Sequence, residues 1–246
     1  MMKFNTSGLV IRIIDIGEYD RLITLLTPDM GVIKAFCRGV RRIKSRRLNA
    51  ASLLTYSEFT ITKRKDNYVI DEALPVETFF GLREDVERLA LAQYFCEFFN
   101  EIIPESDESE QALRLILNSL YFLSKGEKPT LLIKAITELR LLSSAGFMPN
   151  LIGCFDCGEY ESDVMMFNIT EGTLFCENCS ESKAHIKLPL PCIRALRHII
   201  YSDFEKLFSF SLSCDNAKLL SIVVEKYMLS ITNRSFKSLD FFNTIV

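Results

Sequence analysis

The hydrophobic positions of the chain follow two different periods, and the change falls near residue 80. Before it, short segments rich in Ile, Val, Leu, Thr and aromatic residues are separated by turns, a pattern typical of β-strands. The predicted strands are 8–15, 21–27, 32–38, 53–63 and 68–73. Five antiparallel strands of this length are the right number for a small closed barrel, either an OB-fold or an SH3-like barrel.

Two connections between these segments carry turn-forming residues. In the sequence TPDMG, Pro28 fixes the first dihedral angle of a turn and Gly31 can take a positive φ. This combination suits a hairpin between the second and third strands. Asp66 and Asn67 suit a turn between the fourth and fifth strands.

From about residue 82 the apolar positions recur every 3.6 residues, which predicts helices. Segment 82–103 is apolar on several faces and should form a central helix. A second helix is expected to have Asp107 as its N-cap and to end near Gly126, and a third should begin at Pro129 and end near Gly146. Further helices are predicted at 191–201 and 215–232, and short strands at 165–169 and 173–175.

Four of the eight cysteines form two close pairs, Cys154-x2-Cys157 and Cys176-x2-Cys179, with 18 residues between the pairs. Each pair can place two thiolates on one tight turn, and the intervening segment can fold back to complete a tetrahedron. Four thiolates leave no position for a catalytic water. The spacing therefore predicts one structural Zn²⁺, in preference to disulfides or a redox dithiol.

The composition predicts a folded cytoplasmic protein. Hydrophobic residues make up 48% of the chain, but no apolar run reaches the about 20 residues needed to span a bilayer, and the first residues lack an apolar signal segment. Thiols stay reduced in the cytosol, which favours metal binding for paired cysteines. The other four, Cys37, Cys96, Cys192 and Cys214, sit among apolar residues and are predicted to be buried and unreactive.

Positive charge is concentrated in one part of the chain. The net charge is -3, yet residues 1–80 contain 13 Lys and Arg against 9 Asp and Glu. Seven cations lie between residues 34 and 47 with no acidic residue among them: Lys34, Arg38, Arg41, Arg42, Lys44, Arg46 and Arg47. Such a run can be an ordinary solvated loop. Because it begins in a barrel strand, it also suits an electrostatic groove for a nucleic-acid backbone.

Four aromatic residues of the barrel segments, Phe36, Tyr56, Phe59 and Tyr68, are candidates for stacking on bases. In a small barrel, however, alternate residues point inward. We expect at least half of these four side chains to belong to the core.

The sequence contains none of the common enzyme active-site motifs considered. HExxH, GxSxG, Walker A and GxGxxG sequences are absent, and a zinc deaminase would need an HxE or CxE segment before Cys154. The only histidines are His185 and His198. We expect His185 to be a surface residue rather than a metal ligand, and His198 to lie in or beside the core. The chain is predicted not to be an enzyme.

Three segments, in this order, resemble the RecO family of bacterial recombination mediators. Residues 17–28 (GEYDRLITLLTP) lead through Gly31 to the loop 39–45 (GVRRIKS), the sequence ELRLL at 138–142 is followed by GFMP at 146–149, and the cysteine pairs come next. Each segment alone is a weak signal. Together, in sequence over nearly the whole chain, they form a specific combination.

The resemblance implies an α+β fold with several domains. Residues 1–80 would form an OB-fold, residues 81–246 a helical domain, and residues 150–182 a zinc module inserted in it. It also implies a recombination mediator of the RecF pathway of DNA repair. Such a protein binds single- and double-stranded DNA, anneals complementary strands, associates with RecR and helps RecA displace single-strand-binding protein.

Particular residues of this chain are expected to bind these partners. The seven cations are expected to contact phosphates, because they are dense and no acidic residue lies among them. Arg140, in the ELRLL helix, could pair with the acidic C-terminal tail of single-strand-binding protein, or equally form a structural salt bridge. The alternative function is a zinc-containing adaptor that recruits proteins and binds DNA only incidentally.

Overall fold

The computed structural model describes residues 2–65, 67–104, 109–180, 182 and 184–246. The chain divides into two compact units: the first joins Met1–Lys125 with Phe236–Val246, and the second is Gly126–Ser235. The C-terminal segment thus belongs to the same unit as the N-terminus. The predicted domains, 1–80 and 81–246, were divided where strands give way to helices. That these two segments are separate domains stays a prediction.

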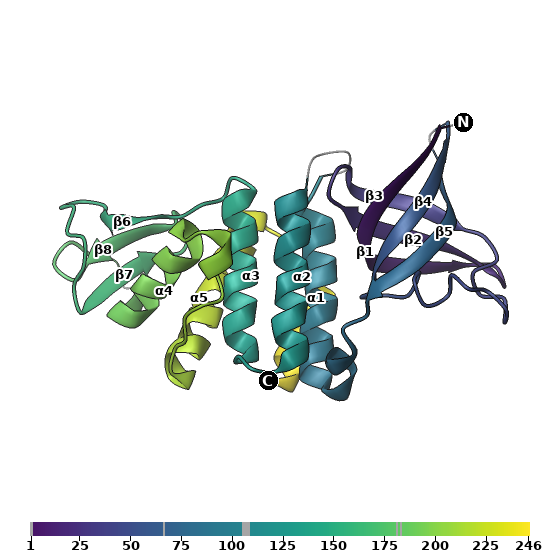
Figure 1. The fold of residues 1–246 in the computed structure, drawn as a ribbon. Helices are drawn as coiled ribbons and strands as arrows, with labels where there is room; N and C mark the ends of the chain where they lie inside the picture. Colours follow the sequence, from purple (N-terminus) through teal and green to yellow (C-terminus); the bar gives the residue numbers. More distant parts are fainter. Residues whose placement is uncertain (1, 66, 105–108, 181, 183) are drawn as a thin grey trace. The chain divides into compact units, whose positions relative to one another are not determined.

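The first unit begins with a closed barrel of five strands in the order β1-β2-β3-β5-β4 (Figure 1). The strands are β1 (Met2–Ile16), β2 (Asp20–Thr27), β3 (Gly31–Cys37), β4 (Tyr56–Arg64) and β5 (Asn67–Glu77). Strand β1 pairs with both β2 and β4, and β3 runs parallel to β5. This is the Greek-key order of an OB-fold, which excludes the SH3-like alternative and confirms the predicted fold.

Alternating apolar residues fill the barrel, as expected for strands with one buried face. The interior includes Val10, Ile23, Leu25, Ile33, Phe59 and Ile61. The hairpin between β2 and β3 turns at Gly31, whose φ of 58° is the positive value predicted for it. The predicted turn residue Asp66 lies outside the described residues.

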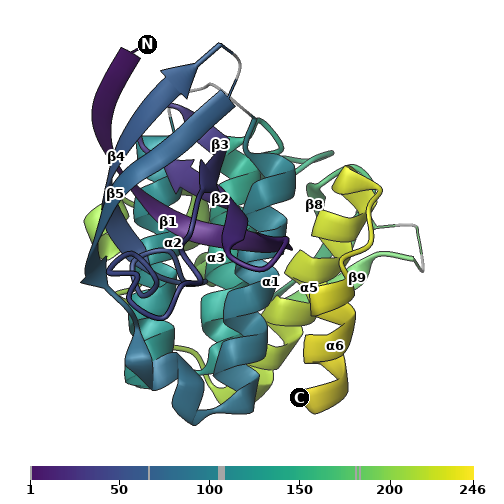
Figure 2. The ribbon, with the colours of Figure 1, turned by 90° about the vertical axis from the view of Figure 1, so that its right-hand side faces the viewer.

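The helices of the first unit are η1 (Phe80–Glu84), α1 (Val86–Ile102), α2 (Glu110–Lys125) and α6 (Lys237–Ile245). The single helix predicted for 82–103 is divided at Asp85. That residue has an extended backbone, and its carboxylate accepts hydrogen bonds from the backbone N–H groups of Glu87 and Arg88, which makes it the N-cap of α1. The predicted N-cap Asp107 lies outside the described residues. Helix α6 was not predicted; it packs along α1 (Figure 2).

The second unit combines helices with a small sheet. Its elements are α3 (Thr130–Ser144), β6 (Asn150–Cys154), β7 (Val164–Asn168), β8 (Thr173–Cys176), β9 (Ile186–Pro189), α4 (Leu190–Tyr201), η2 (Phe204–Lys206) and α5 (Cys214–Thr232). The four strands form one sheet in the order β6-β8-β7-β9. Strands β7 and β8 and the three α-helices lie where the sequence predicted them, whereas β6 and β9 were missed. Within the described residues, no helix combines the length and apolar character required to cross a bilayer.

The ELRLL segment contributes a buried ion pair to this unit. Lys134 and Glu138 are fully buried on α3, and the Lys134 Nζ atom lies 3.0 Å from Glu138 Oε1 and 2.7 Å from Glu225 Oε2 of α5. Removing one member of such a group would leave an unpaired buried charge. Glu138 therefore has a structural role that ties α3 to α5.

Candidate nucleic-acid interface and candidate metal centre

The seven predicted phosphate-binding cations all belong to the barrel part of the first unit. Lys34 is on β3, and the other six are in residues 38–47, which we call the cationic loop and which follows that strand. Arg47 is half-buried and the remaining six side chains are exposed. Six of the seven cations are thus accessible to a ligand, and their contact with DNA stays a prediction.

The cationic loop is attached firmly to the barrel. Val40 is fully buried in the barrel core, and so are Ala50 and Ala51 just after the loop. The backbone N–H of Gly39 donates to the Asp20 carboxylate at 2.6 Å, and that of Arg41 donates to the Tyr19 carbonyl at 3.0 Å. A loop held in this way loses less conformational entropy when it binds a ligand.

Arg47 has its own partners inside the protein. Its Nη1 atom donates to the carbonyls of Ile70 at 2.9 Å and Asp71 at 3.2 Å, and its Nη2 atom donates to the Arg38 carbonyl at 2.8 Å. The side chain therefore fastens the loop to β5. Nothing in the sequence separates this arginine from its neighbours.

Arg41 and Arg42 connect the loop to the β1–β2 turn. The Nη1 atom of Arg41 lies 3.5 Å from Asp15 Oδ2 and donates to the Gly17 carbonyl at 3.3 Å. The Arg42 guanidinium carbon lies 5.5 Å from the centre of the Tyr19 ring, within the range of a cation–π contact. Both guanidinium groups remain exposed, so they can still approach an anion.

A groove of about 540 Å³ separates the cationic loop from β5. Arg42, Lys44 and Arg46 line it on the loop side, while Asp71 and Glu72 line the β5 side. Sequence spacing does not indicate these two carboxylates, because they lie more than 20 residues after the loop. A phosphate backbone would be attracted to one wall of this groove and repelled by the other, which would orient a bound strand.

The four aromatic candidates for base stacking are buried or half-buried against other residues of the barrel. Phe59 is 1% exposed and belongs to the core. Tyr68 packs against that core and contacts Phe4 edge to face, with ring centres 6.1 Å apart. Phe36 and Tyr56 are half-buried. Tyr19, which was not singled out, is half exposed beside the cationic loop.

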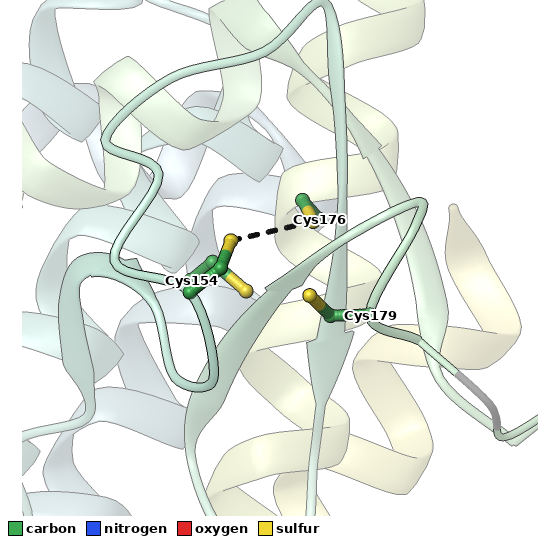
Figure 3. A group of neighbouring side chains, drawn as sticks. Cys154, Cys176 and Cys179 are labelled. Atoms are coloured by element: carbon green, nitrogen blue, oxygen red, sulfur yellow. Dashed lines mark hydrogen bonds between the residues drawn. The ribbon is translucent and has the colours of Figure 1, made fainter.

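The four paired cysteines meet in the second unit, and Figure 3 shows three of them converging. Their Sγ atoms all lie within 4.8 Å of one another, and those of Cys157 and Cys176 are 3.7 Å apart. A tetrahedral zinc ion with Zn–S bonds of about 2.3 Å requires sulfur atoms about 3.8 Å apart. The four thiols therefore fit a closed zinc site.

Strand ends and turns of the backbone position both cysteine pairs of the cluster. Cys154 ends β6 and Cys176 ends β8, and each is followed by a turn that returns the second cysteine of the pair. In the second pair, the backbone N–H of Cys179 donates to the Cys176 carbonyl at 3.2 Å. Burial raises the pKa of the Cys154 thiol, but hydrogen bonds from the backbone of Cys157, Cys176 and Asp156 outweigh it and lower that pKa to about 6. The thiolate is the form that binds metal.

Both histidines are engaged in packing. His185 is half-buried; its Nδ1 atom lies 2.9 Å from Ser180 Oγ, and its ring stacks on Phe175. His198 is half-buried, with Nε2 2.9 Å from the Lys206 carbonyl oxygen. Among the residues with described coordinates, the metal-binding group contains the four cysteines and no histidine.

The prediction for the remaining cysteines is confirmed for three of them. Cys37, Cys96 and Cys192 are buried, and burial raises the pKa of Cys96 to about 12 and that of Cys192 to about 11. Cys214 is exposed, so the prediction was wrong there. It is the first residue of α5, directly after the N-cap Ser213, where a side chain can point to solvent despite apolar neighbours in sequence.

Arg140 makes a structural contact. Its Nη1 atom donates to the carbonyls of Ile199 at 3.0 Å and Ile200 at 2.7 Å, in the last turn of α4. A cation at this end of a helix satisfies free carbonyls and complements the helix dipole. Its predicted contact with the tail of single-strand-binding protein stays a prediction.

Arg197 of α4 holds the chain on both sides of the first cysteine pair. Its guanidinium donates to the carbonyls of Leu151 at 2.7 Å and Ile152 at 3.2 Å before the pair, and to that of Tyr160 after it. The group also lies 4.1 Å from the centre of the Tyr160 ring, and Arg197 is only 7% exposed. This buried side chain closes the base of the loop that carries Cys154 and Cys157.

We expect Arg197→Ala to destabilise the second unit by about 3 kcal/mol, because it leaves several carbonyl groups without their charged donor. Thermal unfolding followed by calorimetry measures the change. Arg194→Ala is the matched control, since Arg194 contacts Glu161 from an exposed position and its loss should have little effect. Equal stability of the two variants would contradict this role for Arg197.

Similarity to known proteins identifies the family of this chain. A model described as "Recombination protein O N terminal" matches residues 1–79, and one described as "Recombination protein O C terminal" matches residues 83–240. The DNA repair protein RecO of Acetivibrio thermocellus is 36% identical over 246 residues, covering 100% of this chain and 98% of the relative. The DNA repair protein RecO of Caldicellulosiruptor bescii is 29% identical over 245 residues, with 100% of both chains covered. The chain therefore belongs to the RecO family of DNA repair proteins.

Proposed function

We propose that this protein is a DNA-binding recombination mediator. It would bind single- and double-stranded DNA, anneal complementary strands and, with RecR, help load RecA on DNA covered by single-strand-binding protein. Membership of the RecO family supports the role in DNA repair. The observation that carries the DNA-binding part is the firmly attached, exposed cationic loop on an OB-fold.

The proposed mechanism uses electrostatic capture rather than covalent chemistry. Cations of the loop displace the counterions condensed on the phosphates of a bound strand, which favours binding at low salt. A surface that neutralises part of the charge of one strand also lowers its repulsion of a second strand, and this promotes annealing. No step requires nucleotide hydrolysis, and the protein would act in the cytoplasm at the nucleoid.

We also propose that the cysteine cluster holds one structural zinc ion. The sulfur separations and the four-thiol donor set support this assignment. The ion would cross-link β6 and β8 through the turns that follow them. No open coordination position would remain for a catalytic water.

The salt dependence of single-strand binding tests the proposal. If about five cations contact phosphates, log K falls with log salt at a slope of roughly -3.5, which is about a 100-fold loss of affinity between 50 and 200 mM salt. Replacing Arg38, Arg42, Lys44 and Arg46 by Ala should reduce this slope to roughly -0.7 and weaken binding strongly at low salt. Arg41 and Arg47 are retained because both bind carbonyl groups of the barrel.

A charge-matched variant provides the control for this experiment. Replacing Lys187, Lys206, Lys218 and Lys226 by Ala removes four exposed cations from the second unit and changes the net charge by the same amount. Its slope should stay near that of the wild type. A slope near zero for the wild type, or an unchanged slope after the loop substitutions, would contradict the proposal.

A second candidate function, recruitment of protein partners, is favoured by exposed apolar side chains beside the cysteine cluster. Ile152, Phe155 and Tyr160 are each more than 60% exposed. Two results together would favour this adaptor function. The wild type would fail to bind DNA, and the variant with the neutralised cationic loop would still bind RecR or single-strand-binding protein.

A further inference from the structure

The side chain of Ile43, on the cationic loop, is apolar and fully exposed to solvent. Its relative exposure is 103%, the highest among the exposed large apolar side chains of the described residues. Its sequence neighbours are Arg42 and Lys44, and Arg41 and Arg46 lie close by in the chain. Single exposed apolar residues are common on protein surfaces, but this one occupies the middle of the strongest cationic segment.

Ile43 lies in the second of two consecutive tight turns. The N–H of Arg42 donates to the Gly39 carbonyl at 3.2 Å, and the N–H of Ser45 donates to the Arg42 carbonyl at 2.8 Å. Ile43 is therefore the second residue of a hydrogen-bonded turn that spans residues 42–45. This position usually suits proline or polar residues better than a β-branched apolar one. The hydrogen bonds of Gly39 and Arg41 to the β1–β2 turn fix the start of the loop.

The surroundings of Ile43 define the chemistry of what could cover it. Five exposed cations of the loop favour a polyanionic ligand, whereas the isoleucine side chain favours an apolar surface at the same point. Single-stranded DNA offers both, because bases that are not paired expose their faces beside the phosphates. Apolar side chains of this size are known to insert between neighbouring bases and separate them.

We propose that Ile43 packs against the bases of a bound single strand, inserted between two neighbouring bases, while the flanking cations hold the phosphates. This inference rests on the proposed DNA-binding function. A strand held with one base step separated has bases exposed for pairing. The contact would thus assist annealing without adding charge to the interface.

Ile43→Ser tests the inference, because it removes the apolar contact and leaves every cation in place. The probe is an oligonucleotide that contains 2-aminopurine, whose fluorescence rises when stacking on its neighbours is lost. We expect the wild type to raise the fluorescence and Ile43→Ser to raise it much less. Affinity should fall by about 10-fold at every salt concentration, while the slope of log K against log salt stays unchanged.

Two further variants make the test specific. Ile43→Leu keeps an apolar side chain and should retain most of the fluorescence change. Ile222→Ser removes an exposed isoleucine from the second unit and should behave as the wild type. If the wild type binds with the expected salt slope and Ile43→Ser is indistinguishable from it, the inference fails although the proposed function stands. If Ile43→Ser weakens only the binding of an acidic apolar peptide, Ile43 contacts a protein and the inference is overturned.

Discussion

Cys176→Ser is expected to abolish zinc binding and to destabilise the second unit severely. Structural zinc contributes on the order of 10 kcal/mol to the folding of small zinc domains, which is comparable to the whole stability of an ordinary domain. Cys176 ends β8, and its sulfur lies 3.7 Å from that of Cys157, so its loss opens the cross-link between the two cysteine turns. Elemental analysis should find one zinc ion per wild-type chain and none in the variant.

The thermal unfolding of the intact chain measures the consequence. We expect the transition of the second unit to fall to much lower temperature in Cys176→Ser and in wild-type protein treated with a chelator. Cys214→Ser is the matched control, because Cys214 is exposed and lies outside the cluster. Affinity for single-stranded DNA should be retained, because the cationic loop belongs to the first unit. Unchanged stability of both the Cys176→Ser variant and the chelated protein would show that the cluster is not a structural zinc site.

The features predicted correctly from the sequence depend on residues close together in the chain. The turn at Gly31 needs one glycine, the helix periods need a few consecutive turns, and each cysteine pair needs four residues. The OB-fold could be chosen over the SH3-like barrel only by strand order, a long-range property that pattern alone did not contain. The family resemblance supplied that choice.

The features that the sequence did not predict are created by contacts between distant segments. Strands β6 and β9 are five and four residues long, and each exists because a neighbouring strand pairs with it. The groove beside the cationic loop is completed by Asp71 and Glu72 of β5. Arg47 belongs to the same charged run as its neighbours, and only its distance to the β5 carbonyls shows that it fastens the loop.

Helix α6 is the clearest example of such dependence on distant residues. It has nine residues, too few to be stable alone. The Glu97 carboxylate of α1 accepts a hydrogen bond at 3.0 Å from the backbone N–H of Ser238, which caps the start of α6 from another helix. The ring of Phe236, just before α6, lies 5.8 Å from that of Tyr94 and 5.6 Å from that of Phe98. The last segment of the chain thus completes the core around α1.

Phe236→Ala should therefore destabilise the first unit although it lies more than 130 residues after α1. Phe236 is 1% exposed, and replacing a buried phenylalanine by alanine costs about 4 kcal/mol, or roughly 15 °C in melting temperature for a unit of this size. Phe241→Ala, on the exposed side of α6, is the control and should change stability little. Deleting residues 236–246 also removes the buried Leu239 and Phe242, so it should unfold the first unit and with it the cationic loop. Equal melting temperatures for Phe236→Ala and Phe241→Ala would mean that α1 holds its fold without the C-terminal segment.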